Sequence, residues 1–291
     1  MKEAMLYEII NKNLLKCKVC NHYCLIKNNA RGICGVRQNI DSVMFALNYG
    51  LTIARAIDPI EKKPIHHFLP RTNTYSFATV GCNLSCAWCQ NWDISQSSKK
   101  GNPIRGKYIS PEKHIEEAVK NKCESISYTY SEPTIFLEYA YDVMKLAHEK
   151  GLKNIWVTNG FMSKETLELI LPLVDAFNVD LKGLNNDNLI RYCGGTINPV
   201  LDNLITIHQR KIHLEITTLV VTGVNDSLQE LSAVADFIIN KLSADVPWHI
   251  TRFYPGYKML NVEPTKVEIL KKAREIAIKK GIKHVHIGNI F

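Results

Sequence analysis

The sequence contains no run of apolar residues that approaches the roughly 18 needed for a membrane-spanning helix. Its opening residues, MKEAMLYEII, are too few and too charged to form a secretory signal stretch. Low-complexity segments and internal repeats are also missing. We therefore expect neither a membrane protein nor a repeat architecture, and we predict a cytoplasmic protein.

A dense basic patch is absent as well. The formal net charge is +8, from 36 Lys and Arg residues against 28 Asp and Glu residues, but the lysines are scattered and are typical of solvated helix faces. Nucleic acid is therefore not a favoured partner. With 291 residues and 46% hydrophobic side chains, the chain can bury a sizeable core as one large α/β domain, with or without a small appendage.

Cysteine, in contrast, is plentiful and clustered. Cys82, Cys86 and Cys89 lie within GCNLSCAWCQN (81–91), with the spacing C-x3-C-x2-C. Without a secretory signal, clustered thiols indicate metal binding or redox work instead of disulfides. A structural zinc site usually needs four ligands, and an iron–sulfur cluster is normally held by four cysteines. Three thiolates would leave one metal position open, as catalytic metal sites do.

From about residue 72 the pattern alternates between short β-rich runs and helical stretches. Repeated alternation predicts a parallel sheet with right-handed crossovers, either open or closed into a barrel. The expected strands are 74–80, 125–130, 154–158, 176–181, 213–221, 248–254 and 284–288. The expected helices are 110–122, 133–151, 163–174, 227–242 and 265–280.

The residues that follow these strands favour the barrel. Glu132, Asn159, Asp180, Lys182 and Arg252 all lie at or just beyond the ends of strands, as the cysteine loop does. In α/β barrels the loops after the strands build the active-site face. Asp, Asn and Gly are common in turns, so no one of these positions is specific by itself. Together with the cysteines they predict an α/β fold of the partial (β/α)6 barrel type.

Four more cysteines occur near the start of the chain, where Cys17, Cys20, Cys24 and Cys34 are spaced C-x2-C-x3-C-x9-C. The segment is too short to build its own core, so a bound metal would supply much of its folding free energy. We expect a closed site that holds zinc or a second iron–sulfur cluster, with zinc favoured. The predicted division is a cysteine-rich segment and connector (1–70) followed by the barrel (71–291).

The C-x3-C-x2-C motif, with Trp88 before the last cysteine and its place after the first strand, resembles the radical S-adenosylmethionine (SAM) superfamily. The resemblance implies that three cysteines hold a 4Fe–4S cluster whose fourth iron is chelated by SAM. Reduction then cleaves SAM to methionine and a 5′-deoxyadenosyl radical that takes hydrogen from the substrate. It also implies an electron donor such as ferredoxin or flavodoxin.

Further motifs are similar to segments of glycyl-radical activases. In YSEPT (130–134), Glu132 matches the position that holds the methionyl amino group of SAM. In VTNG (157–160) and VDLKG (179–183), Asn159, Asp180 and Lys182 match positions near the ribose and carboxylate. We also assign Trp88, Val221 and Arg252 to the cofactor site.

The start of the chain, together with LNYGLTIARAIDPIEKKPIHHFLP (47–70) and WHITRFYPGYKM (248–259), resembles the AmmeMemoRadiSam-system radical enzymes. The resemblance implies a Memo-like and an Amme-type protein as candidate partners.

Three functions stay open at this point: a radical enzyme acting on a small molecule or a peptide or protein side chain, a glycyl-radical-enzyme activase, and a metal-knuckle RNA-binding protein. Two minor features also stay open. Lys62, Lys63, His66 and His67 cover the cofactor, meet an acidic partner or form an ordinary basic connector. Cys123 and Cys193 are interpreted most simply as a buried thiol and a loop thiol, with a position facing the substrate as the alternative for Cys193.

Overall fold

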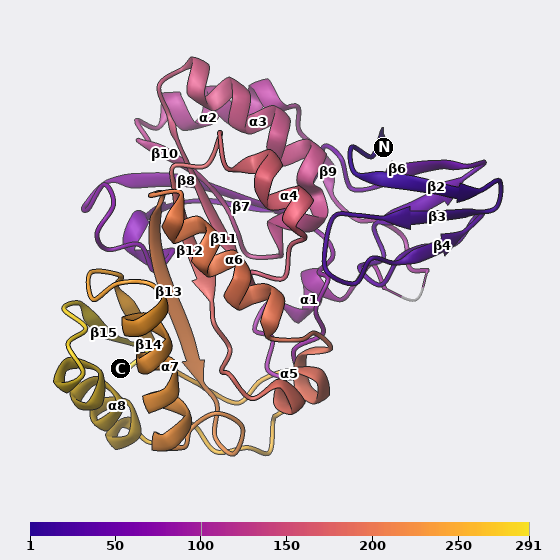
Figure 1. Ribbon diagram of the computed structural model, residues 1–291. Helices are drawn as coiled ribbons and strands as arrows, with labels where there is room; N and C mark the ends of the chain where they lie inside the picture. Colours follow the sequence, from indigo (N-terminus) through magenta and orange to yellow (C-terminus); the bar gives the residue numbers. More distant parts are fainter. Residues whose placement is uncertain (100, 291) are drawn as a thin grey trace.

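A computed structural model describes residues 1–99 and 101–290. Its centre is one nine-stranded sheet with the order β15-β14-β13-β12-β11-β10-β8-β7-β9 (Figure 1). Seven neighbouring strands are parallel, as the sequence predicts. They are β8 (Asn73–Thr79), β10 (Ser125–Tyr128), β11 (Lys153–Thr158), β12 (Ala176–Asp180), β13 (His213–Val220), β14 (Trp248–Arg252) and β15 (Val285–Gly288). Within the described residues the outer strands β15 and β9 do not pair, so the barrel is partial.

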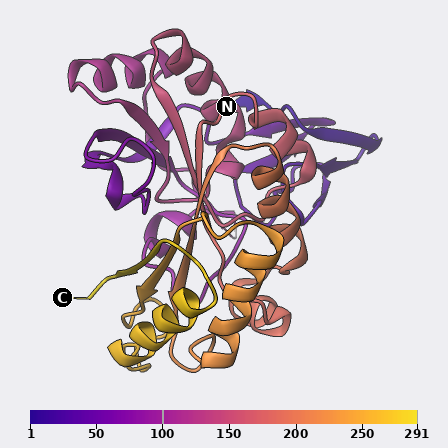
Figure 2. The same cartoon turned by 60° about the vertical axis from the view of Figure 1, so that its left-hand side comes forward.

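Helices connect successive strands and cover the outside of the sheet, as the two views show (Figures 1 and 2). The expected helices correspond to α2 (Pro111–Lys120), the 3-10 turn η2 (Pro133–Phe136) with α3 (Leu137–Glu149), α4 (Lys164–Ile170), α7 (Leu228–Lys241) and α8 (Val267–Lys279). Ser110, Ser163 and Ser227 each cap a helix by accepting a hydrogen bond from a backbone N–H.

Several elements are absent from the sequence prediction. The helices α5 (Asn186–Cys193) and α6 (Asn198–Gln209) lie between β12 and β13, and the short α1 (Trp92–Ser95) follows the cysteine loop. Strand β7 (Leu51–Pro59) runs antiparallel to β8, and β9 (Lys107–Tyr108) pairs with β7. Residues 51–59 fall within the predicted N-terminal segment and connector (1–70), and the structure pairs them with β8 of the large sheet.

The N-terminal residues form two small antiparallel sheets beside the barrel (Figure 1). One contains β1 (Lys2–Glu3), β6 (Val43–Ala46) and β5 (Arg37–Ile40), and the other contains β2 (Tyr7–Asn11), β3 (Leu14–Cys17) and β4 (Leu25–Lys27). A fully buried ion pair joins β5 to α3, because Arg37 donates two hydrogen bonds of 2.9 and 2.6 Å to Glu138. This segment is therefore packed against the barrel at a fixed position.

The connector between β7 and β8, including the 3-10 turn η1 (Ile60–Lys62), enters the barrel at the amino-terminal ends of the parallel strands, which we call its lower end. Ile60 and Ile65 are buried against Ile155 and Ala176. The carboxylate of Glu215 accepts hydrogen bonds from the backbone N–H groups of both His66 and His67. The connector therefore closes the lower end of the barrel, opposite the cysteine loop.

Candidate functional site

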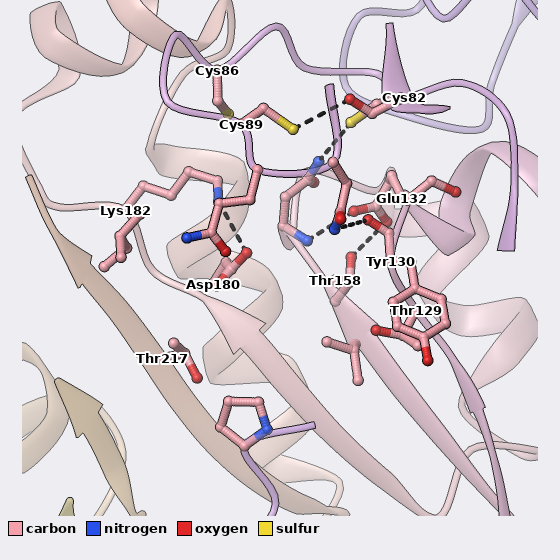
Figure 3. Close-up of a pocket in the computed structure, with 18 of the residues that line it drawn as sticks. Cys82, Cys86, Cys89, Thr129, Tyr130, Glu132, Thr158, Asp180, Lys182 and Thr217 are labelled. Carbon is pink, nitrogen blue, oxygen red and sulfur yellow. Dashed lines mark hydrogen bonds and ion pairs between the residues drawn. The ribbon is translucent and has the colours of Figure 1, made fainter. Parts of the chain in front are cut away.

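An open cavity of about 390 Å³ lies at the carboxyl ends of the parallel strands (Figure 3). Its lining comes from the cysteine loop, from the ends of β10, β11 and β12, and from the connector below. Eight of the residues singled out from the sequence line it together: Cys82, Cys86, Trp88, Cys89, Glu132, Asn159, Asp180 and Lys182.

The cysteine loop is held by backbone hydrogen bonds to the end of α5. The N–H of Ser85 donates to the carbonyl of Cys193 over 2.7 Å, and that of Ala87 donates to Tyr192 over 2.9 Å. The loop therefore rests on a helix that the sequence did not predict. Cys193 was expected in a loop, but it is the last residue of α5 and is buried.

The three thiols have different environments. Burial raises the pKa of Cys82 and Cys89, and the nearby Glu132 carboxylate raises that of Cys82 further. Cys86 differs, because its hydrogen bond with the Cys193 thiol, opposed by burial and aided by the Lys182 charge, lowers its pKa below the ordinary value. In the part of the chain that the structure describes, no three His, Cys, Asp or Glu side chains are arranged around one metal ion.

Glu132 is a buried carboxylate with four neutral hydrogen-bond donors. Its Oε1 accepts from the backbone and hydroxyl of Thr134 and from the Thr158 hydroxyl, at 3.1, 2.6 and 2.6 Å. Its Oε2 accepts only the backbone N–H of Asn159, at 2.8 Å. Burial raises the pKa of Glu132 despite these donors. The carboxylate thus caps η2 and also keeps acceptor capacity on Oε2 for a cationic ligand.

Asn159 links this carboxylate to the cysteine loop. Its side-chain amide donates to the side-chain oxygen of Asn83 over 2.7 Å and lies 3.8 Å from the sulfur of Cys82. Its own side-chain oxygen accepts the N–H of Phe161 over 2.9 Å. Both ends of the amide are therefore fixed, and the residue holds the two sides of the cavity together.

Asp180 and Lys182 face the thiols from the end of β12, where their side chains form an ion pair of 3.0 Å. The Lys182 side chain is only 14% exposed, whereas that of Asp180 is 41% exposed. Burial opposes the charge on Lys182, but Asp180 and the Cys86 thiol raise its pKa above the ordinary value. Lys182 thus keeps a positive charge beside Cys86, and Asp180 leaves carboxylate oxygen accessible from the cavity.

Most residues on the floor of the cavity were not predicted from the sequence. Only Lys62 and Lys63 were named there as candidates for covering the cofactor. Lys63 is buried and pairs with Asp58 at 2.8 Å, and the Tyr130 hydroxyl donates to the same carboxylate at 2.8 Å. Burial opposes ionisation of Asp58, but these hydrogen bonds hold its pKa well below the usual range. Thr217 and Leu219 could have been predicted from the sequence. They are two residues apart on β13, and alternate residues of a strand point to the same face of the sheet.

Other predicted residues lie outside this lining. Val221 is buried just beyond β13, and Arg252 donates to the Thr265 carbonyl over 2.7 Å and to the Tyr254 hydroxyl over 3.0 Å. Their assignment to the cofactor stays a prediction. The four N-terminal cysteines line a separate, small cavity, and all nine cysteines are free of disulfides. None of the described helices is long and apolar enough to cross a membrane.

Comparison with known proteins identifies a family. The model of the radical SAM superfamily matches residues 77–238. An uncharacterized protein of Methanocaldococcus jannaschii is 43% identical over 290 residues, which cover 100% of this chain and 86% of that protein. A second protein of that archaeon, provisionally named a glycyl-radical enzyme activating enzyme, is 26% identical and matches 69% of this chain and 75% of its own length.

Solved structures show the same fold at low sequence identity. A radical SAM methyltransferase from Sphaerobacter thermophilus superposes with a TM-score of 0.57 at 12% identity, covering 99% of this chain and 76% of that one. Streptococcus suis SuiB bound to S-adenosylmethionine gives a TM-score of 0.56 at 15% identity over 72% of this chain and 48% of its own.

Proposed function

The chain belongs to the radical SAM superfamily, which uses a 4Fe–4S cluster and SAM, and from this premise we propose that Cys82, Cys86 and Cys89 hold that cluster. Each thiolate would bind one iron, and the fourth iron would be left for the cofactor. When bound, the two groups supply reductive cleavage of SAM to methionine and a 5′-deoxyadenosyl radical that removes hydrogen from a substrate. The chain's own residues supply position, charge and exclusion of water.

One observation carries this proposal: the triad, Glu132 and the Asp180–Lys182 pair line the same cavity. Its volume of about 390 Å³ lies within the range of small-molecule sites. Oε2 of Glu132 would accept a hydrogen bond from the ammonium of the methionyl group, because only one neutral donor occupies it in the structure. Asn159 and Asp180 would hold the ribose and carboxylate end, and the buried Trp88 lines the same cavity.

The reaction we propose is hydrogen abstraction of the oxidoreductase or lyase type on a small molecule or a peptide or protein side chain. The substrate would enter near Tyr130 and Thr217, on the side of the cavity away from the triad (Figure 3). A low-potential donor such as ferredoxin or flavodoxin would reduce the cluster. The nine disulfide-free cysteines favour a reducing compartment, such as the cytoplasm, as the place of work.

Activation of a glycyl-radical enzyme is the second candidate, because a relative that matches 69% of this chain carries that name. In that case the substrate is a backbone glycine of a large partner protein. The resemblance to AmmeMemoRadiSam-system enzymes instead supports a Memo-like and an Amme-type protein as partners. Membership of an enzyme superfamily favours both over RNA binding.

Anaerobic purification tests the assignment of the cluster. The variant with Ala at positions 82, 86 and 89 should lose about four irons per chain relative to the native protein, because a 4Fe–4S core needs these thiolates. It should also form no 5′-deoxyadenosine from SAM and dithionite. Cys123→Ala is the matched control, since this buried thiol lies outside the cavity and its loss should leave iron content unchanged. Equal iron in native and triple-variant protein would contradict the proposal.

A second experiment, on the native protein, separates the two candidate functions. Native protein mixed with a glycyl-radical enzyme from the same genome should show a protein-based glycyl radical by electron paramagnetic resonance if it is an activase. Hydrogen abstraction from a small substrate predicts instead that adding this substrate increases the rate at which 5′-deoxyadenosine forms above the rate with SAM and dithionite alone.

A further inference from the structure

The four N-terminal cysteines surround one small cavity at the junction between the N-terminal strands and the barrel. Cys17 ends β3, Cys20 and Cys24 lie in the turn that follows it, and Cys34 lies in the turn before β5. All four line the same cavity, and Cys17, Cys20 and Cys34 are less than one-tenth exposed. Four free thiols facing one internal space are a ligand set for a metal group.

Four cysteines are the ligand set both of a structural zinc ion and of a closed 4Fe–4S cluster. The choice between the two depends on what else faces the cavity.

A second observation points independently to a ligand in this space. Arg37 lines the cavity and is 1% exposed, and its two terminal nitrogens are committed to Glu138. Its Nε is buried and has no hydrogen-bond partner in the described structure. A buried N–H donor without a partner is unfavourable, and a charged one more so. The sulfur of a metal cluster in the cavity would supply the missing acceptor.

His22 is not needed as a ligand, because its Nε2 is bonded to the carbonyl of Asn83 at 2.8 Å.

We propose that Cys17, Cys20, Cys24 and Cys34 hold a second, closed 4Fe–4S cluster, and that the Nε of Arg37 donates a hydrogen bond to it. The cluster takes the place of the zinc ion that the sequence favoured. All four irons carry a cysteine ligand, so the site has no position for SAM. It instead fixes the N-terminal segment, which contacts the loop of Cys82 through the bond from His22 to Asn83.

The decisive experiment uses the variant with Ala at positions 82, 86 and 89, because that protein lacks the barrel cluster. After anaerobic expression and purification it should retain about four irons and four sulfides per chain, with no zinc. One electron from dithionite should convert the remaining cluster to a paramagnetic state. One zinc per chain, or neither metal, would overturn the proposal. Since the barrel triad is already absent, failure here is distinct from failure of the function proposed above.

Two further variants in the same background test the ligands and Arg37. Adding Cys17→Ser and Cys34→Ser should remove the remaining iron, and iron retained in a folded protein contradicts the ligand set. Arg37→Lys keeps the charge next to Glu138 but removes Nε, so the cluster should persist with a more negative reduction potential. An unchanged potential would show that the Nε does not contact the cluster. Cys123→Ser serves as the control, because it should change neither iron content nor potential.

Discussion

The backbone N–H of Asn159 donates a 2.8 Å hydrogen bond to Oε2 of Glu132, so the ends of β11 and β10 meet at one carboxylate. The side chain of the same Asn reaches Asn83, next to the first cysteine of the triad. Residues that are far apart in sequence are thereby tied into one frame. Any ligand that binds Glu132 is consequently held at a defined place relative to Cys82.

Replacing Glu132 with Gln should separate its role as the cap of η2 from its proposed role in binding SAM. If Oε2 holds the SAM ammonium, the loss of a charge-assisted bond of roughly 1.5–3 kcal/mol weakens SAM binding tenfold or more. The iron content should stay at the native level, and 5′-deoxyadenosine formation should fall. Equilibrium binding of SAM to anaerobic protein measures the first effect.

Thr134→Val is the matched control for this variant. It removes the hydroxyl donor to Oε1 but leaves the backbone cap and the negative charge in place. Both variants should be slightly less stable, whereas only Glu132→Gln should bind SAM more weakly. Unchanged SAM affinity in Glu132→Gln would leave Glu132 as the cap of η2.

Asp180→Asn tests whether Asp180, at the end of β12, binds the cofactor or only forms the ion pair with Lys182. An ion pair at a partly exposed site contributes at most about 1 kcal/mol to stability, so the variant should fold normally. A carboxylate that hydrogen-bonds the ribose should cost about tenfold in SAM affinity when neutralised. Asp187→Asn, in the first turn of α5, is a control of equal charge change outside the cavity lining. Equal affinities in the two variants would reduce Asp180 to a structural partner of Lys182.

The barrel and most of the cavity lining could be predicted from the sequence for a physical reason. Parallel strands buried on both faces are short apolar runs, and the polar residues that follow them must gather at one edge. Glu132, Asn159 and Asp180 could be placed on that argument alone. Position after a strand does not say which way a side chain points, however, and Val221 and Arg252 lie outside the cavity for that reason.

The segment after β12 could not be predicted from local pattern. Residues 185–195, NNDNLIRYCGG, are rich in Asn and Gly, which are typical of turns. The helix α5 forms there because Asn185 caps it and the left-handed Gly194 ends it, while Leu189 and Cys193 are buried against the core. Tertiary packing decided this element, and with it the environment of Cys86.

Gly35 should tolerate no side chain. Its φ is +75°, and an added Cβ would lie 2.3 Å from the carbonyl oxygen of Ser98. Gly35→Ala should therefore lower the free energy of unfolding by about 1–2 kcal/mol from backbone strain and by a further ~1–3 kcal/mol from the clash. Gly151→Ala isolates the strain, since its φ is +73° and an added Cβ meets nothing within 4 Å. Urea unfolding should rank the native protein first, Gly151→Ala second and Gly35→Ala last, and similar losses in both variants would contradict the close approach.

His114 should make the protein sensitive to acid. Its ring is fully buried, stacks on Phe77 at 4.1 Å and hydrogen-bonds the hydroxyls of Tyr75 and Tyr139 at 3.0 and 2.6 Å. Burial, together with the charge of Arg55, lowers its pKa from 6.5 to about 3. Between these two values the unfolded chain binds a proton that the folded chain does not, so stability falls as the pH decreases through this window. The slope from this group approaches about 1.4 kcal/mol per pH unit.

His114→Gln should lose that part of the slope, although it is less stable at pH 8 because the stacking is lost. Phe77→Leu should also be less stable at pH 8 but keep the native slope. Urea unfolding between pH 4 and pH 8 measures both quantities, and a native slope in His114→Gln would show that this histidine does not titrate as its burial requires.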